Sequence, residues 1–404
     1  MEKSHFFRYL LGYLFTLLGL LLYLLDIALD IKNAVSFYQD GDYMYMAVMI
    51  FLLLGSSVLL QVFSWLWYSD SLDKIKTKVE KFANSHTLLT PLHFLQLGVH
   101  LRYAGVIEMS TTRFYHHAKS FTEGEADLNL DFQMLRLFEA FSESAPQLTL
   151  MMCVILRRRE LELITGLKIL LSAAAIASTV ALYHRSMRAF QENHKMSSTS
   201  TIIYFLWNLL LIIPRVTALA LFCSVLTYYI IAHFLSLWML LVLGVWSQKT
   251  DHMESPGCEW LYRATVGLIW YFSWFSVSTA SVKLKAYLYY GVMGLDTMML
   301  LGFWCWKEYE GRLSSLKPYI VIPTLLGLYI VGILFRIIYY RWFHPNCDEQ
   351  KIPKPNEQQN TKHPAGLYIV ETDSLGSSED AAAPAQPVTG VLKRGRNMAA
   401  NFYY

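Results

Sequence analysis

Ionisable side chains recur inside stretches of sequence that are otherwise apolar. Asp26 and Asp30 lie four residues apart in one stretch, and Glu139 and Glu143 repeat that spacing in another. Residues four apart share one face of a helix, so each pair presents both carboxylates to the same neighbour. The other polar residues that stand out in such stretches are Arg136, Gln147, Arg215, Asp296 and Arg336.

Two interpretations account for these charges. An ionised side chain at the centre of a bilayer costs roughly 2.5–3.5 kcal/mol to insert, so these groups must face protein or water. They could be structural ion pairs, for example Asp26 or Asp30 with Arg215 or Arg336. Alternatively they line a polar track for a charged headgroup or ion. Acidic pairs with several arginines suit a zwitterion, because its phosphate and amine need opposite partners, whereas an ion filter needs a ring of like groups.

We expect the two roles to divide between different residues. Asp26 and Asp30 should be mainly structural. Glu139 and Glu143 lie near Pro146, and Arg215 follows Pro214. Irregular backbone at such prolines is tolerated in a membrane only against protein or a water-filled cavity. The residues expected to be mainly functional are Glu139, Glu143 and Arg215.

The composition of the chain indicates the elements that must position these groups. Of its 404 residues, 54% are hydrophobic and 16% are charged, whereas a soluble domain is nearer 25% charged. Apolar segments of about 20 residues can cross the hydrocarbon as helices. The candidate segments are roughly 9–31, 43–67, 88–107, 132–156, 161–183, 202–222, 225–246, 260–280, 285–306 and 318–341.

Some of these segments need not cross fully. Segment 88–107 is short and polar, segment 132–156 contains Pro146, and segment 202–222 contains Pro214. We therefore predict an all-α polytopic membrane protein with about eight transmembrane helices and two re-entrant half-helices. The segments could also form two structural repeats.

Lysine and arginine in short loops predict the orientation. The linker 69–87 holds four lysines, whereas the linker 32–42 holds only Lys32. This asymmetry places both termini in the cytosol. We divide the chain into a transmembrane domain, 1–342, and a cytosolic flexible tail, 343–404, which holds six of the twelve prolines.

The motifs of several other classes are absent from the sequence. It contains no Gly-rich phosphate loop, HExxH or GxSxG, so we expect no catalytic residue, no cofactor and no covalent chemistry. His116 and His117 form a lone pair, which is more often solvated than metal-binding, so no metal site is expected. Basic residues form no long stripe, and no nucleic-acid partner is expected.

A set of short motifs between residues 10 and 345 resembles the XK-related family when taken in order. The motifs are Leu24-Leu25-Asp26 through Asp30, Phe63-Ser64-Trp65-Leu66-Trp67, Met134-Leu135-Arg136-Leu137-Phe138-Glu139, Pro146-Gln147-Leu148, Tyr204-Phe205-Leu206-Trp207-Asn208, Pro214-Arg215-Val216, Glu259-Trp260-Leu261-Tyr262-Arg263, Tyr271-Phe272-Ser273-Trp274-Phe275 and His344-Pro345.

The regions around Asn208 and Tyr271 are most similar to a family member that is a caspase-activated phospholipid scramblase. The resemblance implies exposure of phosphatidylserine at the plasma membrane in apoptosis, independent of ATP and calcium. It also implies eight spans, two partial helices and a single-pass immunoglobulin-type subunit such as basigin or neuroplastin. Related chains carry Asp where this one has Leu182, which weakens the expectation that this position is part of the lipid path.

Two alternatives from other classes stay open. The chain could be a non-scrambling membrane scaffold or transporter accessory subunit, since some relatives act mainly in complexes. It could also be a solute transporter, which would have a closed site at the midplane. A scaffold has no need of a cleavable, inhibitory end, so the tail discriminates between these functions.

The tail contains sequences that a caspase can cleave. A caspase needs Asp before the scissile bond, a small residue after it and an unfolded strand around both. Val370-Glu371-Thr372-Asp373 followed by Ser374 meets these needs, and Asp380 followed by Ala381 is a second possibility. We predict that cleavage after Asp373 removes an inhibitory segment. Otherwise the tail serves only trafficking and interaction.

Overall fold

The computed structural model describes residues 2–69, 77–116, 123–159, 163–189, 196–248, 250, 253, 255–276, 282–311 and 316–343. Every regular element within these ranges is helical, and none of them is a strand. The prediction of an all-α protein is confirmed on this part of the chain. The tail with Asp373 and Asp380, and also His117, lie outside the described residues.

The first half of the described chain forms α1 (Glu2–Gln39), α2 (Tyr43–Ser69), α3 (Lys78–Ser85), α4 (Leu89–Phe94), α5 (Gly98–His116), α6 (Glu123–Glu139), the π-helical turn η2 (Ala140–Ser144) and α7 (Ala145–Arg158). The second half forms α8 (Leu163–Ala189), α9 (Ser198–Val225), α10 (Tyr229–Trp246), α11 (Pro256–Phe272), α12 (Val282–Gly311), α13 (Pro318–Ile338) and the π-helical turn η3 (Tyr339–Phe343).

Five of the described helices are long and apolar enough to cross a membrane: Tyr43–Ser69, Thr165–Arg188, Ser198–Val225, Tyr229–Trp246 and Pro318–Phe343. They support a membrane protein, while the count of eight spans and the repeats stay predictions. Helix α9 differs from the other four, because 67% of its most apolar window is buried inside the protein. The buried share of the corresponding window is only 17–28% in the other four helices. The other four spans therefore turn most of their apolar surface outward, where lipid can cover it.

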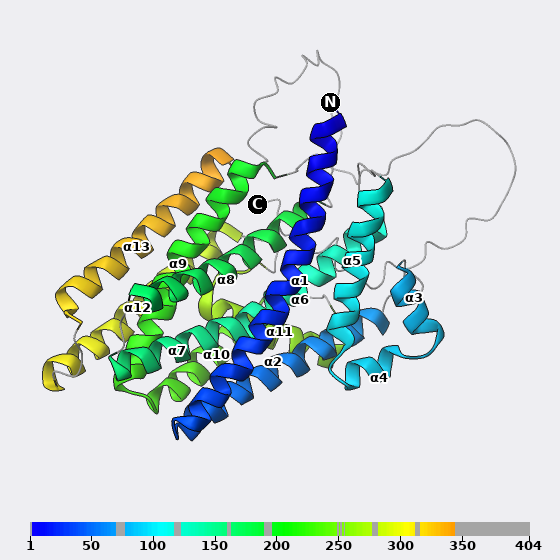
Figure 1. The fold of residues 1–404 in the computed structure, drawn as a ribbon. Helices are drawn as coiled ribbons and strands as arrows, with labels where there is room; N and C mark the ends of the chain where they lie inside the picture. The colour runs from blue at the N-terminus through cyan, green and yellow to red at the C-terminus, as the bar shows by residue number, and fades with distance from the viewer. Residues whose placement is uncertain are drawn as a thin grey trace, which may run out of the picture.

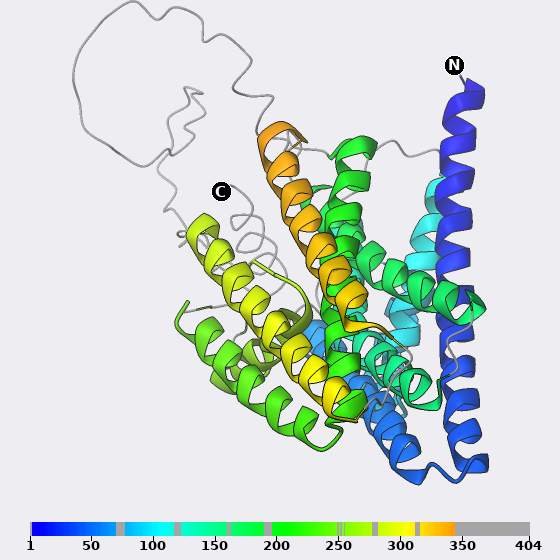
Figure 2. The same ribbon diagram turned by 90° about the vertical axis from the view of Figure 1, so that its left-hand side faces the viewer.

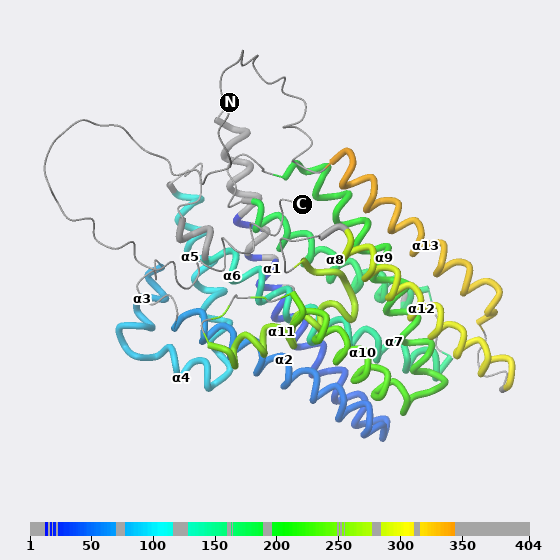
Figure 3. The backbone as a smooth tube through the Cα atoms, turned by 180° about the vertical axis from the view of Figure 1, so that it is seen from behind, coloured from blue at the N-terminus to red at the C-terminus, as the bar shows by residue number. Residues whose placement is uncertain are grey.

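Helix α9 forms the core of the bundle, with α7, α8, α12 and α13 packed around it. Figures 1 and 2 show this arrangement from two sides, with α1 at the edge of the molecule, and Figure 3 shows the backbone from behind. Helix α1 begins and α13 ends on the same face, which we call the terminal face (Figure 1). The opposite face, with the turn between α1 and α2, is the distal face. The assignment of the terminal face to the cytosol stays a prediction.

The three segments expected to be irregular behave differently from one another. Helix α9 runs without interruption through Pro214, so the break expected there is absent, since close packing on several sides holds the helix together. Around Pro146 the helix widens into the turn η2 instead of breaking, and π-helical turns of this kind are common at functional sites. Segment 88–107 does break, between α4 and α5, where Gln96 has a φ of 64°.

Candidate functional site

The first group of predicted site residues gathers where α1 meets α6, η2 and α7, and we call it the acidic cluster: Asp26, Asp30, Arg136, Glu139, Glu143 and Gln147. Arg136 Nη1 lies 2.8 Å from Glu139 Oε2. The side-chain amide of Gln147 donates to Asp30 Oδ2 over 3.3 Å. Glu143 lies close enough to Asp30 and Glu139 for their charges to interact. The structure thus brings together both acidic pairs that the sequence singled out.

The turn η2 shapes the acidic cluster. It follows Glu139 directly and contains Glu143, and both side chains are buried. On the side of α2, Ser56 Oγ lies 2.7 Å from Ser142 Oγ, so two hydroxyl groups join the polar lining. Asp26 differs from the other members, because it is exposed on α1. The acidic cluster therefore extends from the bundle interior to a helix surface.

A second group, the ion-pair cluster, joins four helices through Arg215. Arg215 Nη1 lies 2.5 Å from Asp296 Oδ2, and Arg215 Nε donates to the carbonyl oxygen of Tyr271 over 3.0 Å. The other carboxylate oxygen, Asp296 Oδ1, lies 3.0 Å from His233 Nε2. The second ring nitrogen, His233 Nδ1, lies 2.9 Å from the Tyr271 hydroxyl. These contacts connect α9 and α12 with α10 and α11.

Arg336 belongs to neither cluster. It is buried in the last turn of α13. Its guanidinium carbon lies within 6.0 Å of the ring centres of Trp207, Tyr287, Tyr290 and Tyr340. Cation–π contacts of this kind hold a cation without neutralising it.

These positions correct the pairing suggested by the sequence. Neither Asp26 nor Asp30 pairs with Arg215 or Arg336, since Arg215 binds Asp296 and Arg336 lies among aromatic rings. The contacts also favour a different division of roles. Within the described residues Asp26 forms no ion pair, whereas Arg215 binds Asp296 and the carbonyl oxygen of Tyr271. The arrangement favours a structural role for Arg215 and leaves Asp26 available to a ligand.

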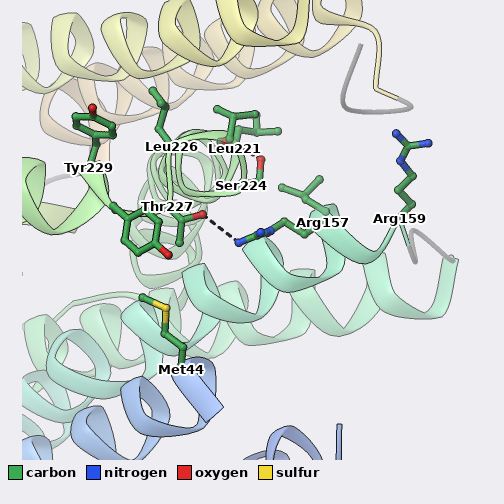
Figure 4. A pocket seen from close by; sticks show the side chains of 11 residues that line it. Met44, Arg157, Arg159, Leu221, Ser224, Leu226, Thr227 and Tyr229 are labelled. Atoms are coloured by element: carbon green, nitrogen blue, oxygen red, sulfur yellow. Dashed lines mark hydrogen bonds between the residues drawn. The ribbon is translucent and has the colours of Figure 1, made fainter. Parts of the chain in front are cut away.

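Sequence reasoning missed the residues of the distal face. A pocket of about 590 Å³ lies between the ends of α7 and α9 and the start of α10. Arg157 and Thr227 meet in it, and Met44 of α2 lies beneath them (Figure 4). Arg157 Nη1 donates to the Tyr45 hydroxyl over 2.7 Å and to Thr227 Oγ1 over 3.1 Å. The available signal was a run of three arginines closing an apolar segment, which usually indicates only solvated side chains.

His233 was also missed, because a single histidine in an apolar segment carries little information by itself. Its role depends on Tyr271 and Asp296, which are 38 and 63 residues away in sequence. In the part of the chain that the structure describes, no group of three His, Cys, Asp or Glu residues could hold a metal ion. The arrangement offers carboxylates, guanidinium groups and hydroxyls, which suit the binding of charged headgroups.

The ion-pair cluster leads to a stability prediction. The substitution Asp296→Asn leaves the guanidinium of Arg215 buried without its counter-charge, which should cost about 3–5 kcal/mol of unfolding free energy. The control Asp26→Asn changes an exposed, unpaired acid and should stay within about 0.5 kcal/mol of the parent. The double change Arg215→Leu, Asp296→Leu should recover part of the loss, because no charge remains buried. Thermal unfolding in detergent measures all three, and equal midpoints for Asp296→Asn and Asp26→Asn would contradict the structural role.

Comparison with known proteins places this arrangement in a family. A family model described as "XK-related protein" matches residues 14–345. Proteins called "XK-related protein 8" from Tetraodon nigroviridis and Gasterosteus aculeatus are 39% and 38% identical to the chain, over 85% of it and over 86% and 87% of their own lengths. One of the same name from Pan troglodytes is 37% identical over 82% of the chain and 83% of its own length. The chain is therefore a membrane protein that belongs to the XK-related family.

Proposed function

We propose that the chain is a phospholipid scramblase that exposes phosphatidylserine at the plasma membrane of apoptotic cells without ATP or calcium. The observation that carries the proposal is the acidic cluster, which extends from the buried Asp30 to the exposed Asp26. Asp26 lies 13 residues before Gln39, the last residue of α1, which is about 20 Å at 1.5 Å per residue. That depth falls well inside a hydrocarbon core about 30 Å thick.

The acidic cluster has the charge that a moving headgroup needs. It holds four carboxyl groups and one arginine, Arg136, so it carries an excess of acid. The amine of phosphatidylserine or phosphatidylethanolamine can bind these carboxylates, while Arg136 can bind the phosphate. Because Asp26 is exposed on α1, the acyl chains can stay in the lipid while the headgroup passes along the cluster. Such movement follows the concentration gradient, and it needs no nucleotide.

The distal pocket can serve as the other end of this route. Glu143 of the acidic cluster lies 14 residues before Arg157 along η2 and α7, which is about 21 Å. Arg157 contacts the hydroxyl groups of Tyr45 and Thr227 at the pocket. A guanidinium group with hydroxyl neighbours suits a phosphate, because arginine presents several donors in a fixed fork. Acidic and basic groups would thus receive the two charges of a zwitterion in turn.

The experiment that tests this function is lipid scrambling by the purified chain in liposomes. A chain that ends at residue 373 should move labelled phospholipid between leaflets faster than the full chain. In the truncated chain, Asp26→Asn and Glu143→Gln should slow scrambling about tenfold, which corresponds to about 1.4 kcal/mol in the barrier. The control Glu310→Gln removes an exposed carboxylate that pairs with Lys307 and should leave the rate unchanged.

Two results of that assay would contradict the proposal. Parental rates in both Asp26→Asn and Glu143→Gln would remove the acidic cluster from the lipid route. No scrambling by the truncated chain would favour the scaffold or accessory subunit instead.

We also propose that a caspase activates the chain by cleavage after Asp373. The change Asp373→Ala should block phosphatidylserine exposure in dying cells, because a caspase cleaves only after Asp. If Asp380 substitutes for it, the double change Asp373→Ala, Asp380→Ala should block exposure. Annexin binding to cells that express each variant measures the effect. Full exposure with the double change would exclude this mode of activation.

We further propose that a single-pass immunoglobulin-type subunit, such as basigin or neuroplastin, delivers the chain to the cell surface. Its transmembrane helix would cover part of the apolar surface that the spans turn outward. In cells that lack all such subunits, surface staining of the chain should fall at least about tenfold while total expression persists. Unchanged surface staining in those cells would refute the need for a partner.

A further inference from the structure

Three buried hydrogen-bond donors without a partner lie together near the terminal face. They are Arg336 Nε, the indole Nε1 of Trp207 and the hydroxyl of Tyr290, and none of them bonds to any part of the chain that the structure describes. The guanidinium carbon of Arg336 lies 4.5 Å from the ring centre of Tyr290 and 5.7 Å from that of Trp207. The two ring centres are 6.5 Å apart. We call these three residues the donor cluster.

Single buried polar atoms without a partner also occur elsewhere in the described chain, such as the Tyr103 hydroxyl and Arg215 Nη2, but here three such donors lie together. Other aromatic donors nearby are satisfied: the Tyr289 hydroxyl donates to the carbonyl oxygen of Trp270 over 2.6 Å. The Tyr329 hydroxyl donates to the carbonyl oxygen of Tyr290, also over 2.6 Å. More than nine in ten buried polar groups in proteins are hydrogen-bonded. A group of three unpaired donors therefore calls for an acceptor that comes from outside the described chain.

The charge of the donor cluster specifies that acceptor. Arginine stays protonated in proteins, and no carboxylate among the described residues pairs with Arg336. All three free groups are donors, so the site lacks only acceptors. The ligand that suits it is an anion with several oxygen atoms, such as a phosphate, because charge-assisted bonds from a guanidinium to phosphate oxygens are short and strong.

The surroundings of the donor cluster face lipid. Tyr287 and Tyr340 also lie against Arg336, and they are 61% and 38% exposed. Ile337 beside them is exposed too, and α12 and α13 diverge toward the terminal face (Figure 2). Arg336 lies seven residues before the end of η3 at Phe343, about 10 Å below that end. An apolar rim at this depth is reached more readily by a lipid than by a free ion or a charged peptide.

We propose that Arg336, Trp207 and Tyr290 bind the phosphodiester of a phospholipid from the leaflet on the terminal face, at a site separate from the acidic cluster. The acyl chains would lie against the exposed apolar residues of α13. The role of this site as a docking place before scrambling rests on the proposed function, whereas the binding itself does not. With both termini in the cytosol, the leaflet is the inner one.

The substitution Tyr290→Phe tests the site with the smallest change. It removes one unpaired hydroxyl, so the unfolding midpoint of the free full-length chain in detergent should stay unchanged or rise. Stabilisation by dihexanoyl phosphatidylserine should then need about tenfold more lipid, as expected for one lost bond to a charged group. The control Tyr289→Phe removes a paired hydroxyl, so it should lower the midpoint of the free chain and leave the lipid response unchanged. Arg336→Gln should abolish the response.

Further arms separate the possible ligands and sites. Inorganic phosphate and dihexanoyl glycerol, which lacks phosphate, should both stabilise the parent much less than the short-chain lipid does. Glu310→Gln should keep the lipid response, because Glu310 lies 20 residues after Tyr290 on α12, about 30 Å away. Equal lipid responses of Tyr290→Phe and the parent would overturn the proposal. It would also be overturned if dihexanoyl glycerol stabilised the parent as much as dihexanoyl phosphatidylserine does. Stabilisation by inorganic phosphate alone would overturn the assignment to lipid.

The same variants distinguish this inference from the proposed function. Binding is measured in detergent, where no scrambling occurs. A chain that binds the lipid through Arg336 but moves no lipid in liposomes supports the site and refutes the scramblase. A chain that scrambles but shows the same lipid response with and without Tyr290→Phe supports the scramblase and refutes the site.

Discussion

Hydrocarbon cannot solvate a charge, and this constraint decides how the helices of this protein are assembled. A buried guanidinium such as that of Arg215 is stabilised where another helix supplies an acid. Asp296 on α12 supplies it, and His233 and Tyr271 extend the contact to α10 and α11. One network of side chains thus fixes the positions of four helices. Helix α9, the most deeply buried span, is held at its middle by that network.

The charges of the acidic cluster and the donor cluster are not balanced, and the sign of the excess differs between the two clusters. The acidic cluster carries four carboxyl groups against Arg136, whereas Arg336 of the donor cluster has no acid beside it among the residues that the structure describes. Structural ion pairing alone would not produce these excesses, because it is cheaper to bury apolar side chains than uncompensated charges. A lipid headgroup carries both a phosphate and an amine. Excess base in one place and excess acid in another would suit the successive binding of these two charges in the proposed function.

The sequence predicts the helical class and the polar residues, because both depend on composition and local spacing. The four-residue spacing of Asp26 and Asp30, and of Glu139 and Glu143, indicated shared faces, and the structure brings both pairs together. The partners could not be predicted, since Arg215 and Asp296 are 81 residues apart and only the packing of α9 on α12 brings them into contact. The irregular backbone predicted at Pro214 is absent for the same reason, because tertiary contacts keep α9 continuous. The unpaired donors of Trp207 and Tyr290 are recognisable only once every neighbouring acceptor is placed.

The two kinds of charged site also differ in how firmly their helices are held. Several neighbouring helices and the ion-pair cluster hold α9, whereas α1 packs mainly against α2 and α5. The carboxylate of Asp30 accepts a bond from Gln147 over 3.3 Å, which is long for a hydrogen bond, and Asp26 adds no ion pair within the described residues. Displacement of α9 would therefore expose a buried ion pair, whereas α1 is held by packing, such as the stacking of Tyr23 on Tyr103, and by the bond from Gln147. The ion-pair cluster is therefore fixed by charge on several helices, while the acidic cluster is fixed on the α1 side mainly by packing.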